Sequence, residues 1–237
     1  MNSRAKMLGM NGTVYTDCTG MGEGNVTTAK DTALLCSELA KYKNLTPYLT
    51  CWLDTVRDGK AELVNLNRLV RTYKGVTGMK AWGSEKAGSC IAATAEKGDM
   101  SVCVVLNGCD SQEDMNAEAK KLLNLAFDTY EIYTPELPED MIKETVVCGG
   151  EELSVKLAPE GLYPIVIPRG TYRMVECNFT AEEKLDAPVK NGETAGEIRY
   201  TMGGEVILEG KIVACKEVKK MNFICGIKKL VYNLLSM

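Results

Sequence analysis

The sequence of 237 residues contains no histidine. This absence excludes the His-dependent catalytic triads, the usual zinc sites and the commonest general base. A Cys-x-x-Cys pair is also missing, although the chain has ten cysteines. Neither a zinc site nor a thioredoxin-like motif is therefore indicated, and we expect no metal and no cofactor. Most of the thiols are expected to be small buried hydrophobes in a reducing or anaerobic setting.

Long apolar runs are scarce as well. The first ten residues, MNSRAKMLGM, lack the apolar core expected of a signal peptide or a membrane-spanning helix. The net charge of −4 provides no basic field for nucleic acid, so we expect no nucleic-acid partner. A content of 45% hydrophobic and 25% charged residues is typical of a globular protein that folds.

The chain is organised around residues 65–108. Two apolar runs, residues 89–95 and 101–107, are joined by the polar turn EKGDM. Such a pair of runs predicts a β-hairpin.

Three segments of this region and the one after it point to a family. They are RTYKGVTGMK, AGSCIAATAEKGDMSVCVVLNG and AEAKKLLNLAFDTY. Together they resemble the serine D-alanyl-D-alanine carboxypeptidases, the low-molecular-mass penicillin-binding proteins that trim peptidoglycan. The resemblance implies an α+β fold: a partial penicillin-binding (β-lactamase-like) domain with helices on an antiparallel sheet, then a small all-β domain and a C-terminal amphipathic helix.

The candidate substrate-binding residue is Lys80. In the family, the strand that corresponds to Lys80-Ala81-Trp82 carries Lys-Thr-Gly, the third signature after Ser-x-x-Lys and Ser-x-Asn. The resemblance implies that Lys80 places positive charge beside the substrate carboxylate. Ala81 cannot donate the hydrogen bond of the threonine, and Trp82 puts a large ring where glycine leaves room. We expect an altered or closed groove, and a shifted register in which Gly83 and Ser84 take these roles is the alternative.

The first two signatures have no counterpart in this sequence. The segment MNSRAKMLGM resembles the part of the family that follows the second signature, which implies that the nucleophilic serine lies upstream of Met1. No catalytic residue is therefore assigned. Residues 3–6 (SRAK) and 42–44 (YKN) fit short patterns of the family, but motif matches need their structural context, and we expect neither to be catalytic.

Three further local patterns are informative. Residues 20–24 are rich in glycine, but neither a strand-then-helix unit nor a following lysine frames them as a phosphate-binding loop, so a flexible turn is predicted. Thr28 with Asp31, and Ser111 with Asp114, form capping boxes. Each box precedes an amphipathic helical stripe.

The domain organisation follows from composition. Residues 1–129 form the carboxypeptidase-like domain, and residues 130–141, with two prolines and four acids, indicate a linker. Residues 142–216 contain short apolar segments separated by glycine-rich turns, which predicts a β domain. Residues 217–237 combine helical apolar spacing with interleaved lysines. From residue 218 onward this helix could bind a membrane surface, or it could dock on its own β domain or on a partner.

The resemblance implies three functional hypotheses. The first is the downstream part of a D-Ala-D-Ala carboxypeptidase that acts on peptidoglycan stem peptides through an acyl-enzyme and is inactive alone. The second is a non-catalytic homologue that binds cell-wall peptide, a partner protein or the membrane. The third is an independent structural or interaction protein.

Location and assembly follow from the same resemblance. We expect the extracytoplasmic face of the cell envelope if a signal lies upstream, and otherwise a cytoplasmic chain. Because the family's core lies partly upstream, an exposed sheet face is expected to favour an oligomer or a complementary chain.

Overall fold

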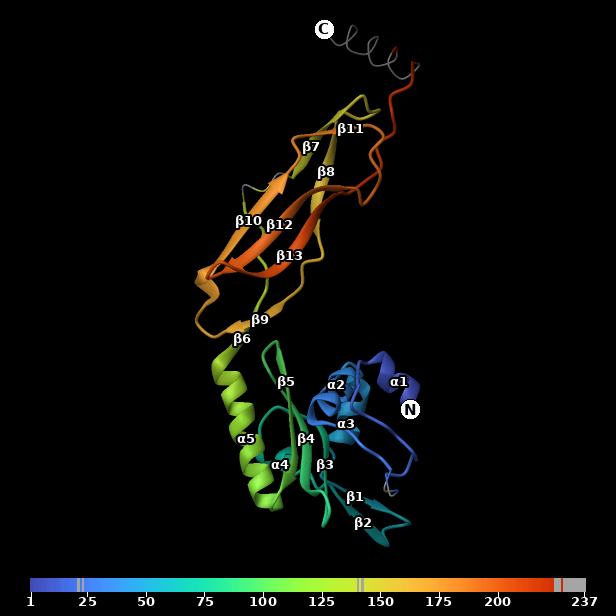
Figure 1. Ribbon diagram of the computed structural model, residues 1–237, viewed down its shortest axis with the longest axis vertical. Coiled ribbons are helices and arrows are strands. Elements are labelled where there is room, and N and C mark those ends of the chain that lie inside the picture. Colours follow the sequence, from blue (N-terminus) through green and yellow to red (C-terminus); the bar gives the residue numbers. More distant parts are fainter. Residues whose placement is uncertain (21, 23, 140, 142, 224–226, 228–237) are drawn as a thin grey trace. The chain divides into compact units, whose positions relative to one another are not determined.

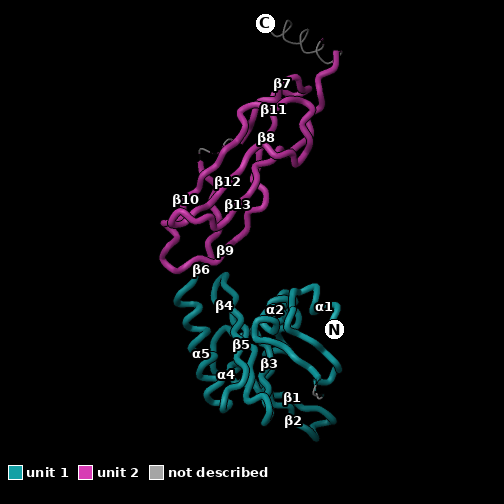
Figure 2. The backbone as a smooth tube through the Cα atoms, in the orientation of Figure 1, with its two compact units in different colours: residues 1–131 teal, residues 132–237 magenta. Residues whose placement is uncertain are grey.

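The computed structural model describes the chain except for residues 21, 23, 140, 142, 224–226 and 228–237 (Figure 1). The chain divides into two compact units, residues 1–131 and residues 132–237 (Figure 2). Unit 1 mixes helices and strands, and the regular structure of unit 2 is almost entirely strand. The α+β class expected from the sequence is thus confirmed.

Unit 1 is built around one antiparallel sheet. Its strands are β3 (Val76–Ser84), β4 (Gly88–Lys97) and β5 (Met100–Cys109), in the order β3-β4-β5, and a separate hairpin joins β1 (Leu53–Val56) to β2 (Ala61–Val64). The helices are α1 (Asn2–Met7), α2 (Ala29–Ala40), α3 (Thr46–Leu49), α4 (Leu69–Thr72) and α5 (Gln112–Thr129), with a 3-10 turn η1 (Lys43–Leu45). The hairpin predicted at residues 89–107 is therefore confirmed as β4 and β5.

The two long helices pack on opposite sides of this sheet (Figure 1). The inward stripe of α5 buries four apolar side chains, those of Met115, Ala119, Leu123 and Phe127. On the other side, Cys36 of α2 packs with Met79 of β3 and Ala92 of β4. This is the layer arrangement that a three-stranded sheet needs to remove its apolar side chains from water.

Both predicted helix caps are present. The hydroxyl of Thr28 accepts a hydrogen bond from the Asp31 N–H at 3.1 Å, and that of Ser111 accepts one from the Asp114 N–H at 3.0 Å. The Asp31 carboxylate is buried and turns to an earlier segment, where it accepts hydrogen bonds from the Gly12 N–H at 2.8 Å and the Thr13 hydroxyl at 2.7 Å. Asp31 therefore takes part in the N-terminal cap of α2 through its N–H, and its carboxylate connects the preceding segment to this helix.

Unit 2 is a β structure. Its strands are β6 (Tyr130–Tyr133), β7 (Glu144–Cys148), β8 (Ser154–Glu160), β9 (Ile165–Pro168), β10 (Val175–Ala181), β11 (Lys184–Asp186), β12 (Thr194–Met202) and β13 (Glu205–Ala214), with a 3-10 turn η2 (Tyr172–Met174). Six of them form a sheet in the order β10-β12-β13-β8-β7-β11, and β6 pairs with β9. All the sheet pairings given for these six strands are antiparallel except that of β11 with β7.

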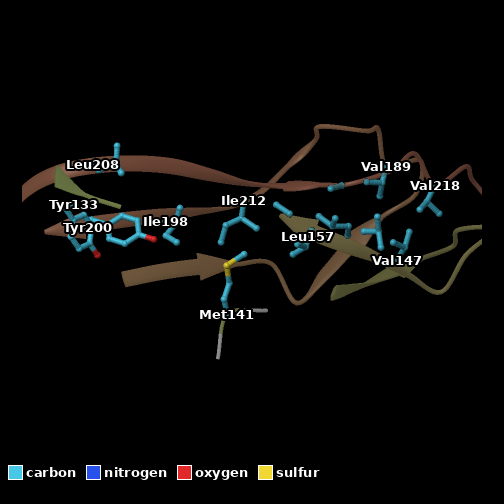
Figure 3. Packing of buried hydrophobic residues seen from close by; sticks show 14 of the residues in the cluster. Tyr133, Met141, Val147, Leu157, Val189, Ile198, Tyr200, Leu208, Ile212 and Val218 are labelled. Atoms are coloured by element: carbon cyan, nitrogen blue, oxygen red, sulfur yellow. The ribbon is translucent and has the colours of Figure 1, made fainter. Parts of the chain in front are cut away.

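One continuous apolar core holds unit 2 together (Figure 3). Tyr200, fully buried, lies at one end of this core, and its hydroxyl donates a hydrogen bond to the Glu136 carbonyl at 2.8 Å. Its ring meets that of Tyr133 edge to face, with centroids 6.1 Å apart. Burial raises the pKa of Tyr200, because the phenolate form would lose hydration in this setting.

The segment expected to be a linker, residues 130–141, belongs structurally to unit 2 for most of its length. It contains β6, and it contributes Tyr133 and Met141 to the core, each about 5% exposed. Prolines and acids dominate its composition, but these two apolar side chains decide its placement. The unit boundary accordingly falls after Glu131.

The predicted C-terminal helix, residues 217–237, differs from the structure at its start. Val218 is buried and forms a β-bridge with Val189, and Lys220 forms one with Gly150. Most of the remaining segment lies outside the described residues. No helix in the described part of the chain is both long and apolar enough to cross a membrane.

Candidate functional site

Strand β3 presents Lys80, Trp82 and Ser84 on one face, because alternate side chains of a strand point the same way. Ala81 points to the opposite face and is 4% exposed. The structure therefore separates the three positions of the predicted signature: Lys80 and Trp82 are exposed on the same side, and Ala81 is part of the core.

A cavity of about 1050 Å³ lies over this face of the sheet. Its floor is formed in part by small residues of β4, which lie beside the large side chains of β3: Cys90 is opposite Trp82 and Ala92 is opposite Lys80, while Gly88 is opposite the small Ser84. The cavity is lined by Thr19, Gly20, Gly22, Asn25, Val26, Thr27, Thr32, Lys80, Trp82, Ser84, Lys86, Ala87, Cys90, Ile91, Ala92, Val105 and Asn107. Trp82 thus forms part of the wall, and space for a ligand remains beside Lys80.

Gly88 is required where β4 begins. Its φ of +66° favours glycine, and a Cβ there would lie 2.9 Å from the Cys109 carbonyl oxygen and 3.0 Å from the Gly108 Cα. The close approach of β5 at this point draws the end of the sheet together under the cavity. The Ala-Gly pair that supported the family resemblance therefore has a physical role here.

The opposite wall is a loop held by the carboxylate of Asp17. One carboxylate oxygen accepts hydrogen bonds from the Thr19 N–H at 2.7 Å, the Thr19 hydroxyl at 2.8 Å and the Gly20 N–H at 2.7 Å. The other accepts from the Gly22 N–H at 3.1 Å and the Asn25 side-chain amide at 2.8 Å. These bonds, first among them the one from the Thr19 hydroxyl, lower the pKa of Asp17 to about 2.

This loop contains the glycine-rich segment, residues 20–24. The backbone N–H groups of Gly20 and Gly22 already bind the carboxylate of Asp17, so they do not form an open cradle for a phosphate. Asp17 is a functional residue that was not predicted from the sequence. Its signal is the Asp-x-Thr spacing of an Asx turn, in which the side chain bonds the backbone two residues on.

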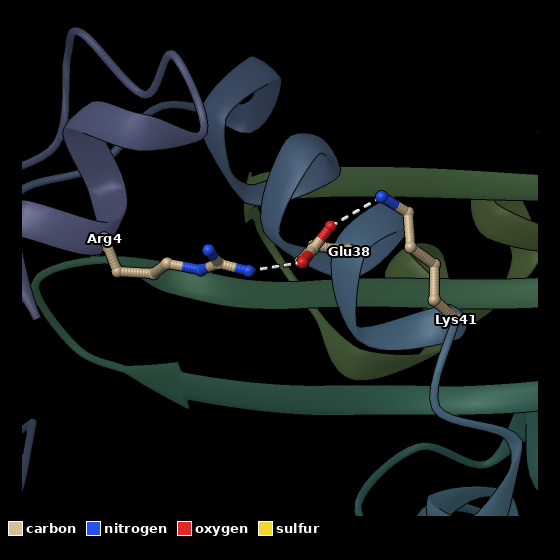
Figure 4. Close-up of polar contacts among 3 residues, drawn as sticks. All are labelled: Arg4, Glu38 and Lys41. Carbon is tan, nitrogen blue, oxygen red and sulfur yellow. Dashed lines mark hydrogen bonds and ion pairs between the residues drawn. The ribbon is translucent and has the colours of Figure 1, made fainter.

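The pattern at residues 3–6 lies away from the cavity lining. Ser3 is exposed on α1, and neither Ser3 nor Lys6 lines the cavity. Helix α1 is attached by an ion pair between Arg4 and Glu38, and Glu38 also binds the Lys41 ammonium at 2.7 Å (Figure 4). The hydrogen bond from Lys41 is the main reason why the pKa of Glu38 is lowered.

The pattern at residues 42–44 is likewise outside the cavity. Lys43 forms an ion pair with Glu96 and lines a second, smaller hollow of about 440 Å³ together with Cys103. Asn44 is exposed and lines neither hollow. Lys80 and Ser84 are therefore the sequence-derived polar candidates that the structure brings to one cavity.

The cysteines are less buried than expected. Of the nine described, Cys36 alone is buried, and four are exposed. The thiols of Cys36 and Cys103 are hydrogen bonded to each other, and this contact, with burial, raises the pKa of Cys103. Among the residues that the structure describes, no cluster of His, Cys, Asp or Glu is arranged to hold a metal ion.

The cavity has the chemistry of an anion site. Lys80 supplies a cation, Ser84 supplies a hydroxyl, and Trp82 supplies an aromatic face, whereas the Thr32 hydroxyl is committed to the Thr28 carbonyl. The charged side chains among the described residues of its wall are lysines, in a chain whose net charge is −4. Such a wall suits a carboxylate.

Each of the two units matches a different known protein family. Residues 1–110 match the family described as D-alanyl-D-alanine carboxypeptidase, and residues 127–220 match the family described as penicillin-binding protein 5, C-terminal domain. D-alanyl-D-alanine carboxypeptidase DacF of Bacillus subtilis is 30% identical over 234 residues, which cover 97% of this chain and 60% of that protein. DacC of Escherichia coli is 29% identical over 94% of this chain and 56% of its own length. The chain thus spans a little over half the length of these relatives.

A solved structure shares the fold. Penicillin-binding protein 5 from Haemophilus influenzae superposes with a TM-score of 0.75 at 23% identity, over 92% of this chain and 64% of that one. At this identity the likeness concerns the fold alone.

Proposed function

The chain belongs to the D-alanyl-D-alanine carboxypeptidase family, and from this premise we propose that unit 1 supplies the Lys80 wall of a site for peptidoglycan stem peptides. The observation that carries the proposal is the cavity beside Lys80. This lysine occupies the position of the family's third-signature lysine, and none of the ion pairs in the described part of the chain includes it. Its ammonium group is available to the terminal carboxylate of a peptide.

The reaction that the family resemblance implies is attack by a serine on the terminal amide, followed by hydrolysis of the acyl-enzyme. Lys80 is the residue of this sequence that we assign to the three signatures, because Ser-x-Asn has no match and the Ser-x-x-Lys pattern of residues 3–6 lies away from the cavity lining. We propose that residues 1–237 do not perform acyl transfer by themselves. The nucleophile and its activating lysine would come from further sequence of the same protein or from a complementary chain.

A second candidate is a non-catalytic homologue that binds cell-wall peptide or a partner protein. The observation that favours it is the pair Ala81 and Trp82. Ala81 is buried and has no hydroxyl, and Trp82 stands in the cavity wall where the family has glycine. A binding protein needs the cation at Lys80 but not the groups that stabilise a reacting carbonyl.

Labelling with a fluorescent penicillin, followed by mass mapping, tests the proposal. We expect no covalent adduct on this chain and reversible binding of acetyl-D-alanyl-D-alanine that Lys80→Ala weakens about tenfold, because a charge-assisted hydrogen bond is lost. Lys60→Ala, in the exposed turn after β1, is the matched control and should leave binding unchanged. An adduct on Ser84 or Ser3 would contradict the catalytic part, and equal effects of the two lysine substitutions would contradict the role of Lys80.

We further propose a location at the extracytoplasmic face of the envelope, with residues 218–237 as a membrane contact except for Val218, which is buried in the core of unit 2. The sequence after Glu217 contains lysines and no acidic residue, which favours anionic lipid. Cosedimentation of the whole chain with vesicles that contain anionic lipid tests this contact. Binding that is equal for neutral and anionic vesicles, or absent from both, would contradict it.

A further inference from the structure

We propose that the Lys80 cavity selects ligands in which a carboxylate is joined by a short spacer to a ring, and that Trp82 is the residue responsible for this selection. The inference rests on the proposed function in one respect, namely that the cavity binds a carboxylate at Lys80. It adds a ligand class that an extended stem peptide does not represent.

The spacing of the two side chains sets the shape of the ligand. Lys80 and Trp82 are two residues apart on one strand and point to the same side, so their Cα atoms are about 6.6 Å apart. A ligand that places its carboxylate at the Lys80 ammonium and extends along β3 toward Ser84 has its next few atoms over Trp82. An acyclic chain covers little of an indole, whereas a ring covers its face.

The surroundings of Trp82 leave that face available. Its exposed fraction is 47%, although the side chain lines a cavity, and its partner across the sheet is the small Cys90. Val26 and Val105 contribute further apolar surface to the same hollow. A half-exposed indole that borders such a hollow gains free energy when a ring removes it from water.

The two tryptophans of the chain allow a direct measurement. Trp52 lies outside the cavity lining, and its ring is covered by the Arg71 guanidinium at 5.0 Å from the ring centroid. In a Trp52→Phe background Trp82 is the single tryptophan, because the chain has two. Its fluorescence then reports occupancy of the cavity, and calorimetry on the same samples gives the affinity.

Four small probes separate the two recognition elements. N-benzoyl-D-alanine has both the ring and the carboxylate, N-benzoyl-D-alaninamide lacks the charge, N-acetyl-D-alanine lacks the ring, and N-acetylmuramic acid replaces the aromatic ring by a sugar. We expect N-benzoyl-D-alanine to bind at least about tenfold more tightly than either probe that lacks one element. N-acetylmuramic acid shows which kind of ring the cavity prefers. If it binds as tightly as N-benzoyl-D-alanine, the ligand class is a sugar that carries a carboxylate. If it binds more weakly, the ligand class is a carboxylate that carries an aromatic ring.

Two substitutions make the assignment specific. Trp82→Leu keeps an apolar side chain and should reduce the preference for ring-bearing probes to about threefold or less, while N-acetyl-D-alanine keeps its affinity. Lys80→Ala should weaken every carboxylate and leave the amide unchanged. Alkylation of Cys90, mapped by mass spectrometry, gives a second readout that needs no tryptophan, because a ligand over Trp82 also covers its neighbour Cys90, while the exposed Cys148 of unit 2 serves as the internal control.

The outcomes separate this inference from the proposed function. Equal affinity for N-benzoyl-D-alanine and N-acetyl-D-alanine, or a ring preference that survives Trp82→Leu, would overturn the role of Trp82 while binding of acetyl-D-alanyl-D-alanine could still stand. Ring-bearing carboxylates that protect Cys90 when the dipeptide does not would support the inference and contradict the peptide as ligand. Absence of binding by all the carboxylates would overturn both.

Discussion

The two units of this chain are stabilised in different ways. The described residues of unit 2 include a large apolar cluster, in which Tyr200, Ile198 and Ile212 are fully buried. The sheet of unit 1 has three strands, its interior side chains include several alanines, and several segments outside the sheet, among them the loop of the cavity wall, are fastened by carboxylates. Asp31 holds residues 12 and 13, Asp17 holds the loop wall, and Glu38 holds α1.

This difference explains how the cavity of unit 1 keeps its shape. A cavity requires that some apolar surface remain uncovered, so the elements around it cannot all be held by burial. Hydrogen bonds to carboxylates fix a loop without filling the space that it borders. We therefore expect unit 1 to respond to loss of charge and unit 2 to loss of volume, and the following predictions test this contrast from the largest effect to the smallest.

The largest effect is expected for Tyr200→Ala in unit 2. The substitution empties a fully buried aromatic site and removes the hydrogen bond to the Glu136 carbonyl, so we expect a loss of about 3–5 kcal/mol in the free energy of unfolding. Hydrogen exchange of β12 and β13 peptides at increasing urea concentration measures it. Tyr163→Ala, at a ring that is 61% exposed, is the control and should change little. A similar loss at both tyrosines would contradict the role of the core.

The next effect is expected for Asp31→Ala in unit 1. The Gly12 N–H and the hydroxyl of the buried Thr13 lose a charged acceptor, and we expect a loss of about 2–4 kcal/mol. Tryptophan fluorescence during urea unfolding measures it, because both tryptophans lie in unit 1. Asp31→Asn keeps one acceptor oxygen and should lose less. An unchanged midpoint would show that burial alone holds these segments.

A smaller effect is expected for the helix caps. Ser111→Ala removes the hydroxyl that accepts from the Asp114 N–H, which should reduce the stability of unit 1 by about 1 kcal/mol. Ser111→Thr keeps both the capping acceptor and the hydroxyl that donates to the Asp114 carboxylate at 2.6 Å, so it should retain most of the stability. A loss for the threonine variant as large as that for the alanine variant, in the same fluorescence assay, would mean that Ser111 matters for another reason than capping.

The sequence predicted local structure well. The caps at Thr28 and Ser111 depend on side chains that bond to backbone three residues away, and the β4–β5 hairpin depends on adjacent runs. Both are therefore visible in a few consecutive residues. Lys80 was found through the family pattern and lies in the cavity wall.

What the sequence did not show depends on distant partners. The placement of residues 130–141 is decided by Tyr133, which packs against Tyr172 and Tyr200 far along the chain. Strand β11 has three residues and pairs in parallel with β7, so it has neither length nor a hairpin turn to indicate it. The loop held by Asp17 forms a cavity wall because of its contact with the sheet, although the Asx-turn spacing itself was readable.

The smallest expected effects are changes of stability with pH, and their direction differs between the two units. The pKa of Asp17 is lowered in the folded state to about 2 from an ordinary 3.8, so its contribution to stability is present above 3.8 and is lost as the pH falls toward about 2. Three of the tyrosines with raised pKa values, Tyr133, Tyr172 and Tyr200, are in unit 2, and their contribution is present below an ordinary value of 10.0 and is lost as the pH rises above it.

Acid should therefore loosen the cavity loop first, and alkali should loosen unit 2. Fluorescence of Trp82 in the Trp52→Phe background follows the loop, because Trp82 and the loop line the same cavity. Asp17→Asn places an amide N–H among the backbone donors and should remove the acid transition by loosening the loop already at neutral pH. Hydrogen exchange of β12 follows unit 2 at high pH. If acid exposed β12 before it changed the emission of Trp82, this result would contradict the claim that carboxylates hold unit 1 while apolar burial holds unit 2.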